Sequence, residues 1–196
     1  MAEIKSTMDL VMERAARMGK ASSDELETEN SRKKGMKLAA EFLDRKKTNL
    51  LEALTGFPNE QQMAIRKGMV EVLLRNIFLP KDDEAQERTR RASEGIVEIG
   101  GGAADLKTIC SEMQQAMEQY RKHREQVKNQ LEEQVKMQYD QLLAQQRSGM
   151  PAEGGNPELA LQAQVKEEWD RLESELSGQY NQAIEQHKIM LQERLG

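Results

Sequence analysis

The 196-residue chain has one cysteine, four prolines and an aromatic fraction of only 4%. A single thiol excludes an internal disulfide framework and is typical of a reducing compartment, so we expect a cytoplasmic location. The few β-branched residues and the four prolines argue against a β-sheet. The N-terminal sequence Met1-Ala2-Glu3-Ile4-Lys5 lacks the basic and then apolar pattern of a secretory signal. No apolar run approaches the roughly 18–20 residues that a membrane-spanning helix needs.

Groups suited to catalysis are also scarce in this sequence. Its two histidines, His123 and His187, do not occur in a metal-ligand spacing. Gly100-Gly101-Gly102 resembles a phosphate-binding loop only superficially, because no Lys-Ser/Thr pair follows it and no strand is predicted before it. Cys110 is expected to act as a small buried apolar residue. We therefore expect no enzymatic activity and no cofactor, and we assign no catalytic or metal-binding residue.

The sequence is rich in charged residues and in apolar residues that recur at helical spacing. Charged residues make up 32% of it and hydrophobic residues 37%, below the roughly 45–50% of an ordinary globular domain. Residues 1–100 carry 18 basic and 18 acidic side chains, so the whole net charge of −5 belongs to residues 101–196. We predict an all-α protein with two regions: a small helical bundle over residues 1–80, and a long antiparallel helical hairpin of coiled-coil character over residues 82–196.

The bundle is predicted to contain three helices. The first ends at Gly19, and the second starts near Asp24 and ends before Gly56-Phe57-Pro58, because proline disfavours a helical conformation in the residue before it. The third helix begins at a capping Asn59 and continues to Pro80. Eight of the eleven residues from 69 to 79 are apolar, which indicates a helix covered on more than one side.

The hairpin is predicted from a stripe with alternating steps of four and three residues, the spacing of a heptad seam. Its members are Ala85, Thr89, Ala92, Ile96, Ile99, Ala103, Leu106, Cys110, Met113, Met117, Tyr120, Arg124, Val127 and Leu131. The step across Gly100-Gly101-Gly102 keeps the phase, which favours a continuous or kinked helix over residues 82–147, with a break or hinge at these glycines as the alternative. After Leu131 the steps to Val135 and Tyr139 are both four residues, a stutter that relaxes the supercoil.

A Gly- and Pro-containing linker over residues 148–157 precedes the last helix, whose start is indicated by Asn156-Pro157-Glu158. Because two helices of similar length are joined by a short linker, we expect them to pair antiparallel. Trp169 is then expected near Val135, and Met190 near Cys110–Met117. The predicted seam of the last helix consists of Val165, Trp169, Leu172, Leu176, Tyr180, Ala183, His187 and Met190.

These features favour a non-enzymatic structural or interaction protein, a coiled-coil scaffold or adaptor whose partner is another protein or a second copy of the chain. The candidate partner-binding residues lie on the first helix and on the hairpin seam: Met8, Val11, Met12, Met113, Met117, Tyr120, Trp169 and Tyr180. A Met-rich apolar face adapts well to partner proteins. The first helix is also the one segment expected to contact a membrane surface peripherally, although its acidic residues weaken the attraction to anionic lipid.

The alternative function is association with nucleic acid through basic clusters at residues 32–47 and 88–91. Phosphate binding requires such clusters to share one face without acidic neighbours. Here Glu41, Asp44, Glu87 and Glu94 are interleaved with the basic residues. The sequence therefore favours solvated helix faces with local ion pairs over nucleic-acid binding.

Overall fold

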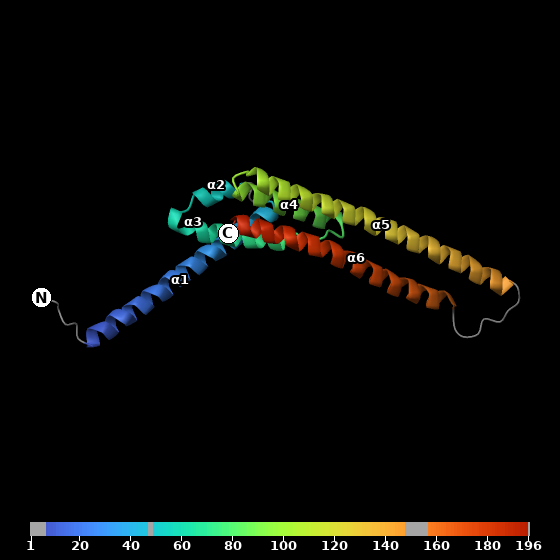
Figure 1. The fold of residues 1–196 in the computed structure, drawn as a ribbon, viewed down its shortest axis with the longest axis horizontal. Helices are drawn as coiled ribbons and strands as arrows, with labels where there is room; N and C mark the ends of the chain where they lie inside the picture. Colours follow the sequence, from blue (N-terminus) through green and yellow to red (C-terminus); the bar gives the residue numbers. More distant parts are fainter. Residues whose placement is uncertain (1–6, 47–48, 148–156, 196) are drawn as a thin grey trace. The chain divides into compact units, whose positions relative to one another are not determined.

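A computed structural model describes the backbone of residues 7–46, 49–147 and 157–195, and the side chains of residues 24–46, 49–141, 143–144 and 161–195. The described residues form helices and no strands, so the protein is all-α (Figure 1). The helices are α1 (Thr7–Leu43), α2 (Leu50–Thr55), α3 (Asn59–Arg75), α4 (Asp83–Ile99), α5 (Ala104–Arg147) and α6 (Pro157–Leu195). The predicted linker over residues 148–157 lies, apart from its last residue, outside the described residues.

The chain divides into two compact units. The first comprises residues 1–77, 90–107 and 192–196, and the second comprises residues 78–89 and 108–191. Residues 90–107, which the sequence assigns to the hairpin, group with the first unit instead.

Helix α1 is longer than predicted, because Gly19 does not end it and no second helix starts at Asp24. A glycine inside a helix costs about 1 kcal/mol relative to alanine, which the neighbouring helix formers and backbone hydrogen bonds can offset. The helix ends instead at Leu43, where Lys46 N–H donates to Glu41 C=O at 2.9 Å and Arg45 N–H to Phe42 C=O at 3.0 Å. This pair of bonds is a Schellman motif, and Arg45 occupies its left-handed position with φ +61°.

The start of α2 is fixed by one local cap and by one contact with a distant segment. Asn49 caps α2 by accepting a 2.8 Å bond from Glu52 N–H. The Glu98 carboxylate of α4 accepts from the backbone N–H groups of Leu50 and Leu51 at 2.6 and 3.1 Å. Helix α3 begins at Asn59, but Pro58 and not Asn59 occupies the cap position and no side chain caps the helix; it ends at Arg75, five residues before Pro80. The prediction of one helix from Asp24 to the residues before Gly56 is therefore wrong, because it misses the turn between α1 and α2.

The core of the first unit lies where α1 and α3 pack against each other (Figure 1). The helices approach closely at Gly35 and Gly68, because a Cβ atom at either position would overlap backbone of the facing helix. The two helices and the segments that cover them bury the following apolar residues: Leu38, Ala39, Phe42, Leu43, Leu50, Leu54, Ile65, Met69, Val70, Leu73, Leu74, Ile77, Ala92, Ile96, Ile99 and Leu106.

The helix predicted to continue through Gly100-Gly101-Gly102 is broken there. Gly102 N–H donates to Val97 C=O and Gly101 N–H to Glu98 C=O, both at 2.9 Å, which is a second Schellman motif. Gly101 and Gly102 have φ values of +69° and +72°, a conformation that glycine adopts at little cost. A Cβ atom at Gly100 would overlap a terminal methyl group of Leu106, so that side chain would have to shift to make room for it. The preserved heptad phase is therefore compatible with a true break.

In the second unit α5 and α6 lie side by side and antiparallel (Figure 1). The Tyr120 and Ser177 hydroxyls are 3.0 Å apart, and Arg124 Nε donates to Glu173 Oε1 at 2.9 Å. His187 Nε2 lies 3.5 Å from Glu112 Oε2 farther along the same pair. These contacts join residues 112–124 of α5 to residues 173–187 of α6.

The seam of α6 differs from the prediction near its C-terminal end. Met190, predicted to face Cys110–Met117, has 39% of its surface exposed, whereas Ile184 and Leu191 are buried. The steps after Leu176 are therefore four residues to Tyr180 and four more to Ile184, which moves the stripe by one residue. An extra four-residue step is closer to the natural period of a straight helix than continued 4,3 alternation.

Candidate protein-docking groove

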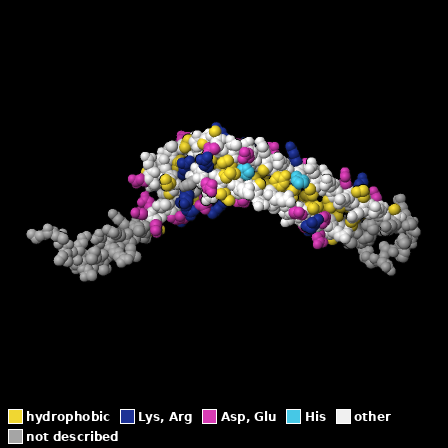
Figure 2. Space-filling model, viewed as in Figure 1, with side chains coloured by type: hydrophobic (Ala, Val, Ile, Leu, Met, Phe, Trp, Pro, Cys, Tyr) yellow, Lys and Arg dark blue, Asp and Glu magenta, His cyan; other side chains and the backbone are white. Residues whose placement is uncertain are grey.

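A groove of about 550 Å³ runs between α5 and α6 in the second unit. Leu131 and Leu161 are buried at its floor, and Val135, Val165 and Trp169 are half-buried along its walls. Tyr139 also lines the groove and keeps 39% of its surface exposed. Figure 2 shows hydrophobic side chains gathered along the surface of this helix pair, between charged ones. The groove therefore presents an apolar lining to solvent.

Trp169 is held in a defined position at this groove. The Arg124 guanidinium carbon lies 5.4 Å from the centroid of the indole ring, within the range of a cation–π contact. Arg124 is itself fixed by its 2.9 Å bond to Glu173. An aromatic side chain that is already ordered loses little conformational entropy when it is covered by another molecule.

Charged side chains form the rim of the groove. Lys128, Lys136 and Lys166 line it together with one acidic residue, Glu132. Lys128 Nζ lies 3.7 Å from Glu132 Oε1, an exposed pair on neighbouring turns of α5. The rim therefore has an excess of positive charge, in a chain whose net charge is −5.

Of the candidate partner-binding residues whose side chains the structure describes, Trp169 lines the groove, whereas Met113, Met117, Tyr120 and Tyr180 do not. Met113, Met117 and Tyr120 are buried, and the Tyr120 ring packs edge to face on the half-buried Tyr180 ring with centroids 5.5 Å apart. These four side chains belong to the interior of the helix pair. Met8, Val11 and Met12 lie in α1, but their side chains are outside the described residues. A contact role for these residues stays a prediction.

The stutter in the sequence coincides with the groove. Leu131, Val135 and Tyr139, the residues of the two consecutive four-residue steps, all line it. A stutter relaxes the left-handed supercoil, so the apolar stripe drifts off the seam and part of it is left uncovered. Leu161 and the rim lysines Lys136 and Lys166 were not identifiable as groove residues, because no seam position or motif marks them.

The histidine and cysteine side chains are engaged in structural contacts. His187 Nδ1 is 2.8 Å from Ala183 C=O within its own helix, and its Nε2 faces Glu112. Cys110 is buried, and burial raises the pKa of its thiol to about 11, which disfavours the nucleophilic thiolate near neutral pH. Among the described residues, no cluster of three or more His, Cys, Asp or Glu side chains is arranged to hold a metal ion.

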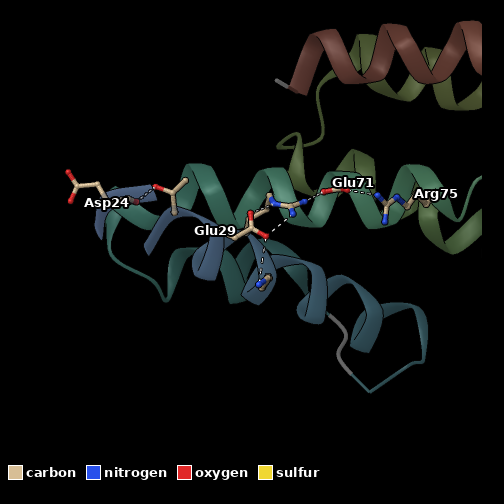
Figure 3. Close-up of polar contacts among 7 residues, drawn as sticks. Asp24, Glu29, Glu71 and Arg75 are labelled. Carbon is tan, nitrogen blue, oxygen red and sulfur yellow. Dashed lines mark hydrogen bonds and ion pairs between the residues drawn. The ribbon is translucent and has the colours of Figure 1, made fainter. Parts of the chain in front are cut away.

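The basic clusters of the alternative function are interleaved with acidic partners. Arg32 Nε donates to Glu29 at 2.8 Å and its Nη1 to Glu71, which also accepts from Arg75 at 2.6 Å (Figure 3). Hydrogen bonding to Arg32 lowers the pKa of Glu29. In the second cluster Arg91 Nε donates to Phe42 C=O at 2.5 Å, and its guanidinium carbon lies 4.4 Å from the centroid of the Phe42 ring. Arg32 and Arg91 of the two predicted clusters are thus held by contacts within the protein, and nucleic-acid binding through these clusters stays a prediction.

The chain belongs to a family of proteins described as "Family of unknown function (DUF6657)", which matches residues 51–193. The match includes α5, α6 and all the residues of the groove. No curated protein matches the chain. No solved structure matches it either. In the part of the chain that the structure describes, none of the helices has the length and apolar character to cross a membrane.

Proposed function

We propose that this member of the DUF6657 family is a non-enzymatic interaction protein, which binds a helical segment of a partner protein in the groove between α5 and α6. The observation that supports this proposal is the apolar lining around Trp169, which the described residues leave open between the two helices. Monomeric proteins seldom leave a contiguous apolar patch of this kind uncovered unless it binds something. Tryptophan is also among the residues that contribute most to protein–protein binding.

The shape of the groove favours a helix as its occupant. Two parallel ridges of side chains with an apolar channel between them accept a third helix, whose apolar stripe completes a three-helix core. The lining residues Leu131, Val135 and Tyr139 recur at the spacing of one helix face, so the apolar surface extends over successive turns of α5 and is not an isolated pocket. We place this interaction in the cytoplasm, where a free thiol such as Cys110 stays reduced.

Site-specific photocrosslinking in the native cell tests the proposed function. A photoreactive phenylalanine analogue replaces Tyr139 in the groove and, in a matched control, Met63, which is exposed on α3. We expect a discrete protein adduct from position 139 that is absent at position 63 and is lost when Val135→Glu is added. An adduct of twice the chain mass would identify a second copy as the partner. No adduct at position 139, or the same adducts at both positions, contradicts the proposal.

A further inference from the structure

The rim of the groove continues into a second, strongly basic cleft of about 580 Å³. Five basic and two acidic residues line this cleft, with Pro80 and Gln86: Lys81, Arg121, Lys122, Arg124, Lys128, Glu118 and Glu125. Lys128 lines both the cleft and the groove, so the two concavities adjoin at this residue. The apolar groove is therefore bordered at one end by the positively charged cleft.

The charged residues of both concavities recur along one face of α5. Lys122, Glu125, Lys128, Glu132 and Lys136 follow one another in steps of three or four residues, which places them on neighbouring turns. The face from Lys122 to Lys136 is about 21 Å long at 1.5 Å per residue. This length corresponds to about four turns of a bound helix.

Not all of the basic side chains in the cleft are equally available. Arg121 donates to Gln86 and, at 3.2 Å, to Asp83, and Arg124 is held by Glu173 and the Trp169 ring. Lys81 and Lys122 in the cleft, and Lys136 and Lys166 on the groove rim, are exposed. Acidic groups on a bound molecule would meet these four lysines first.

We propose that the occupant of the groove is an amphipathic helix whose apolar stripe is flanked by acidic residues, and whose more acidic end lies toward Lys81 and Lys122. This inference rests on the proposed function and adds the chemistry of the partner. Its apolar stripe covers Trp169, Val135 and Tyr139, while its carboxylates meet the exposed lysines. Charge complementarity of this kind speeds association and suppresses partners of the wrong charge.

Two other occupants fit the observed surface less well. In a twofold dimer the same patch meets itself, so the positive rim of one copy would face the positive rim of the other. A nucleic-acid backbone would satisfy the lysines but would leave the apolar floor at Leu131 and Leu161 uncovered.

The test uses the full chain and three Trp-free synthetic helical peptides. The peptides share one pattern of leucines at helical spacing and differ only in their flanking residues, which are all Glu, all Gln or all Lys. Trp169 is the single tryptophan of the chain, so its emission reports on the groove directly. Two charge-reversal variants accompany the wild type: Lys136→Glu/Lys166→Glu on the rim, and Lys37→Glu/Lys67→Glu on exposed positions of the first unit as the control.

We expect the Glu-flanked peptide to shift the Trp169 emission to shorter wavelength and to bind about tenfold more tightly than the Lys-flanked one. The Lys136→Glu/Lys166→Glu variant should abolish or reverse this preference, whereas the Lys37→Glu/Lys67→Glu control should keep it. Raising the salt concentration from about 0.1 M to about 1 M should weaken the preference, since exposed charges are then screened.

Three results overturn the inference. Equal affinity for all three peptides would remove the acidic preference and leave the docking groove in place. Absence of an emission shift with every peptide would show that the groove does not accept such a helix, while the Tyr139 crosslinks decide independently whether it binds a protein. Displacement of the Glu-flanked peptide by duplex DNA at stoichiometric concentration would assign the basic cleft to nucleic acid instead.

Discussion

Gly35 of α1 and Gly68 of α3 bring the two helices so close that neither position can accept a side chain. A Cβ atom at Gly35 would overlap the carbonyl oxygen of Ile65 and lie 2.7 Å from its carbonyl carbon. A Cβ atom at Gly68 would overlap the carbonyl oxygen of Arg32 and lie 2.9 Å from its carbonyl carbon. Backbone atoms cannot rotate away as the end of a side chain can, so the helices themselves would have to separate.

Substituting either glycine by alanine should therefore destabilise the first unit. We expect Gly68→Ala and Gly35→Ala each to lower the free energy of unfolding by about 3 kcal/mol, because separation of α1 and α3 exposes the core between them. Urea unfolding followed by circular dichroism measures this loss. Gly178 in α6 is the control, since a Cβ atom there meets nothing within 4 Å and Gly178→Ala should stabilise its helix by about 1 kcal/mol. A neutral or stabilising Gly68→Ala would contradict the close packing.

At Arg45, in contrast to Gly35 and Gly68, a glycine should stabilise the protein when it is introduced. Its φ of +61° is a left-handed conformation that costs an L-residue about 1 kcal/mol and costs glycine almost nothing. We expect Arg45→Gly to raise the free energy of unfolding by about 1 kcal/mol in urea titrations. Arg45→Ala removes the same charge while keeping the strained conformation, so it should bring no such gain. Equal stabilisation by both substitutions would assign the effect to charge rather than to the backbone.

The hydroxyl pair of Tyr120 and Ser177 links α5 to α6. Removing the buried Tyr120 hydroxyl leaves Ser177 without this partner, so we expect Tyr120→Phe to cost about 1 kcal/mol. In a double-mutant cycle with Ser177→Ala, the coupling energy should be about 0.5–1 kcal/mol. Thermal and urea unfolding of the four proteins supply the cycle. Strictly additive effects would show that the two hydroxyls do not interact in solution.

Cys110 makes stability depend on pH in alkaline solution. Burial raises the pKa of its thiol from 9.0 to about 11, so the unfolded chain loses this proton at a lower pH than the folded chain does. The stabilisation is complete below pH 9 and is lost as the pH rises through about 11. Relative to Cys110→Ala, the wild type should lose about 2 kcal/mol over this interval. Urea titrations of both proteins at the two ends of the interval measure it, and parallel pH profiles would refute the assignment.

The sequence predicts the helical class and much of the buried surface correctly, because both follow from local periodicity. The seam residues Ile96, Ile99, Leu106, Met113 and Tyr120 are all buried as expected. The groove was not predicted, although the stutter at Leu131, Val135 and Tyr139 coincides with it, because a stutter alone does not reveal which side of the stripe is left uncovered.

The helix ends were predicted less well, since several are fixed by residues far away in the sequence. Leu43 ends α1 in a turn where Arg45 adopts an unfavourable conformation, and Arg91 of α4 binds the carbonyl oxygen of Phe42 there. Nothing in the sequence around Leu43 indicates the left-handed conformation of Arg45 or the bond from Arg91. The break at Gly100-Gly101-Gly102 was predicted only as the alternative to a continuous helix, because the heptad phase on its two sides matches whether or not the helix continues.

The bonds from Glu98 to Leu50 and Leu51 also constrain the order in which the first unit folds. Helix α2 has six residues, too few to persist as an isolated helix in water. The carboxylate that binds its first N–H groups comes from a residue 48 positions later in the chain. Helix α2 therefore becomes stable only after α4 has docked, and its backbone amides acquire protection from hydrogen exchange as a late event in folding.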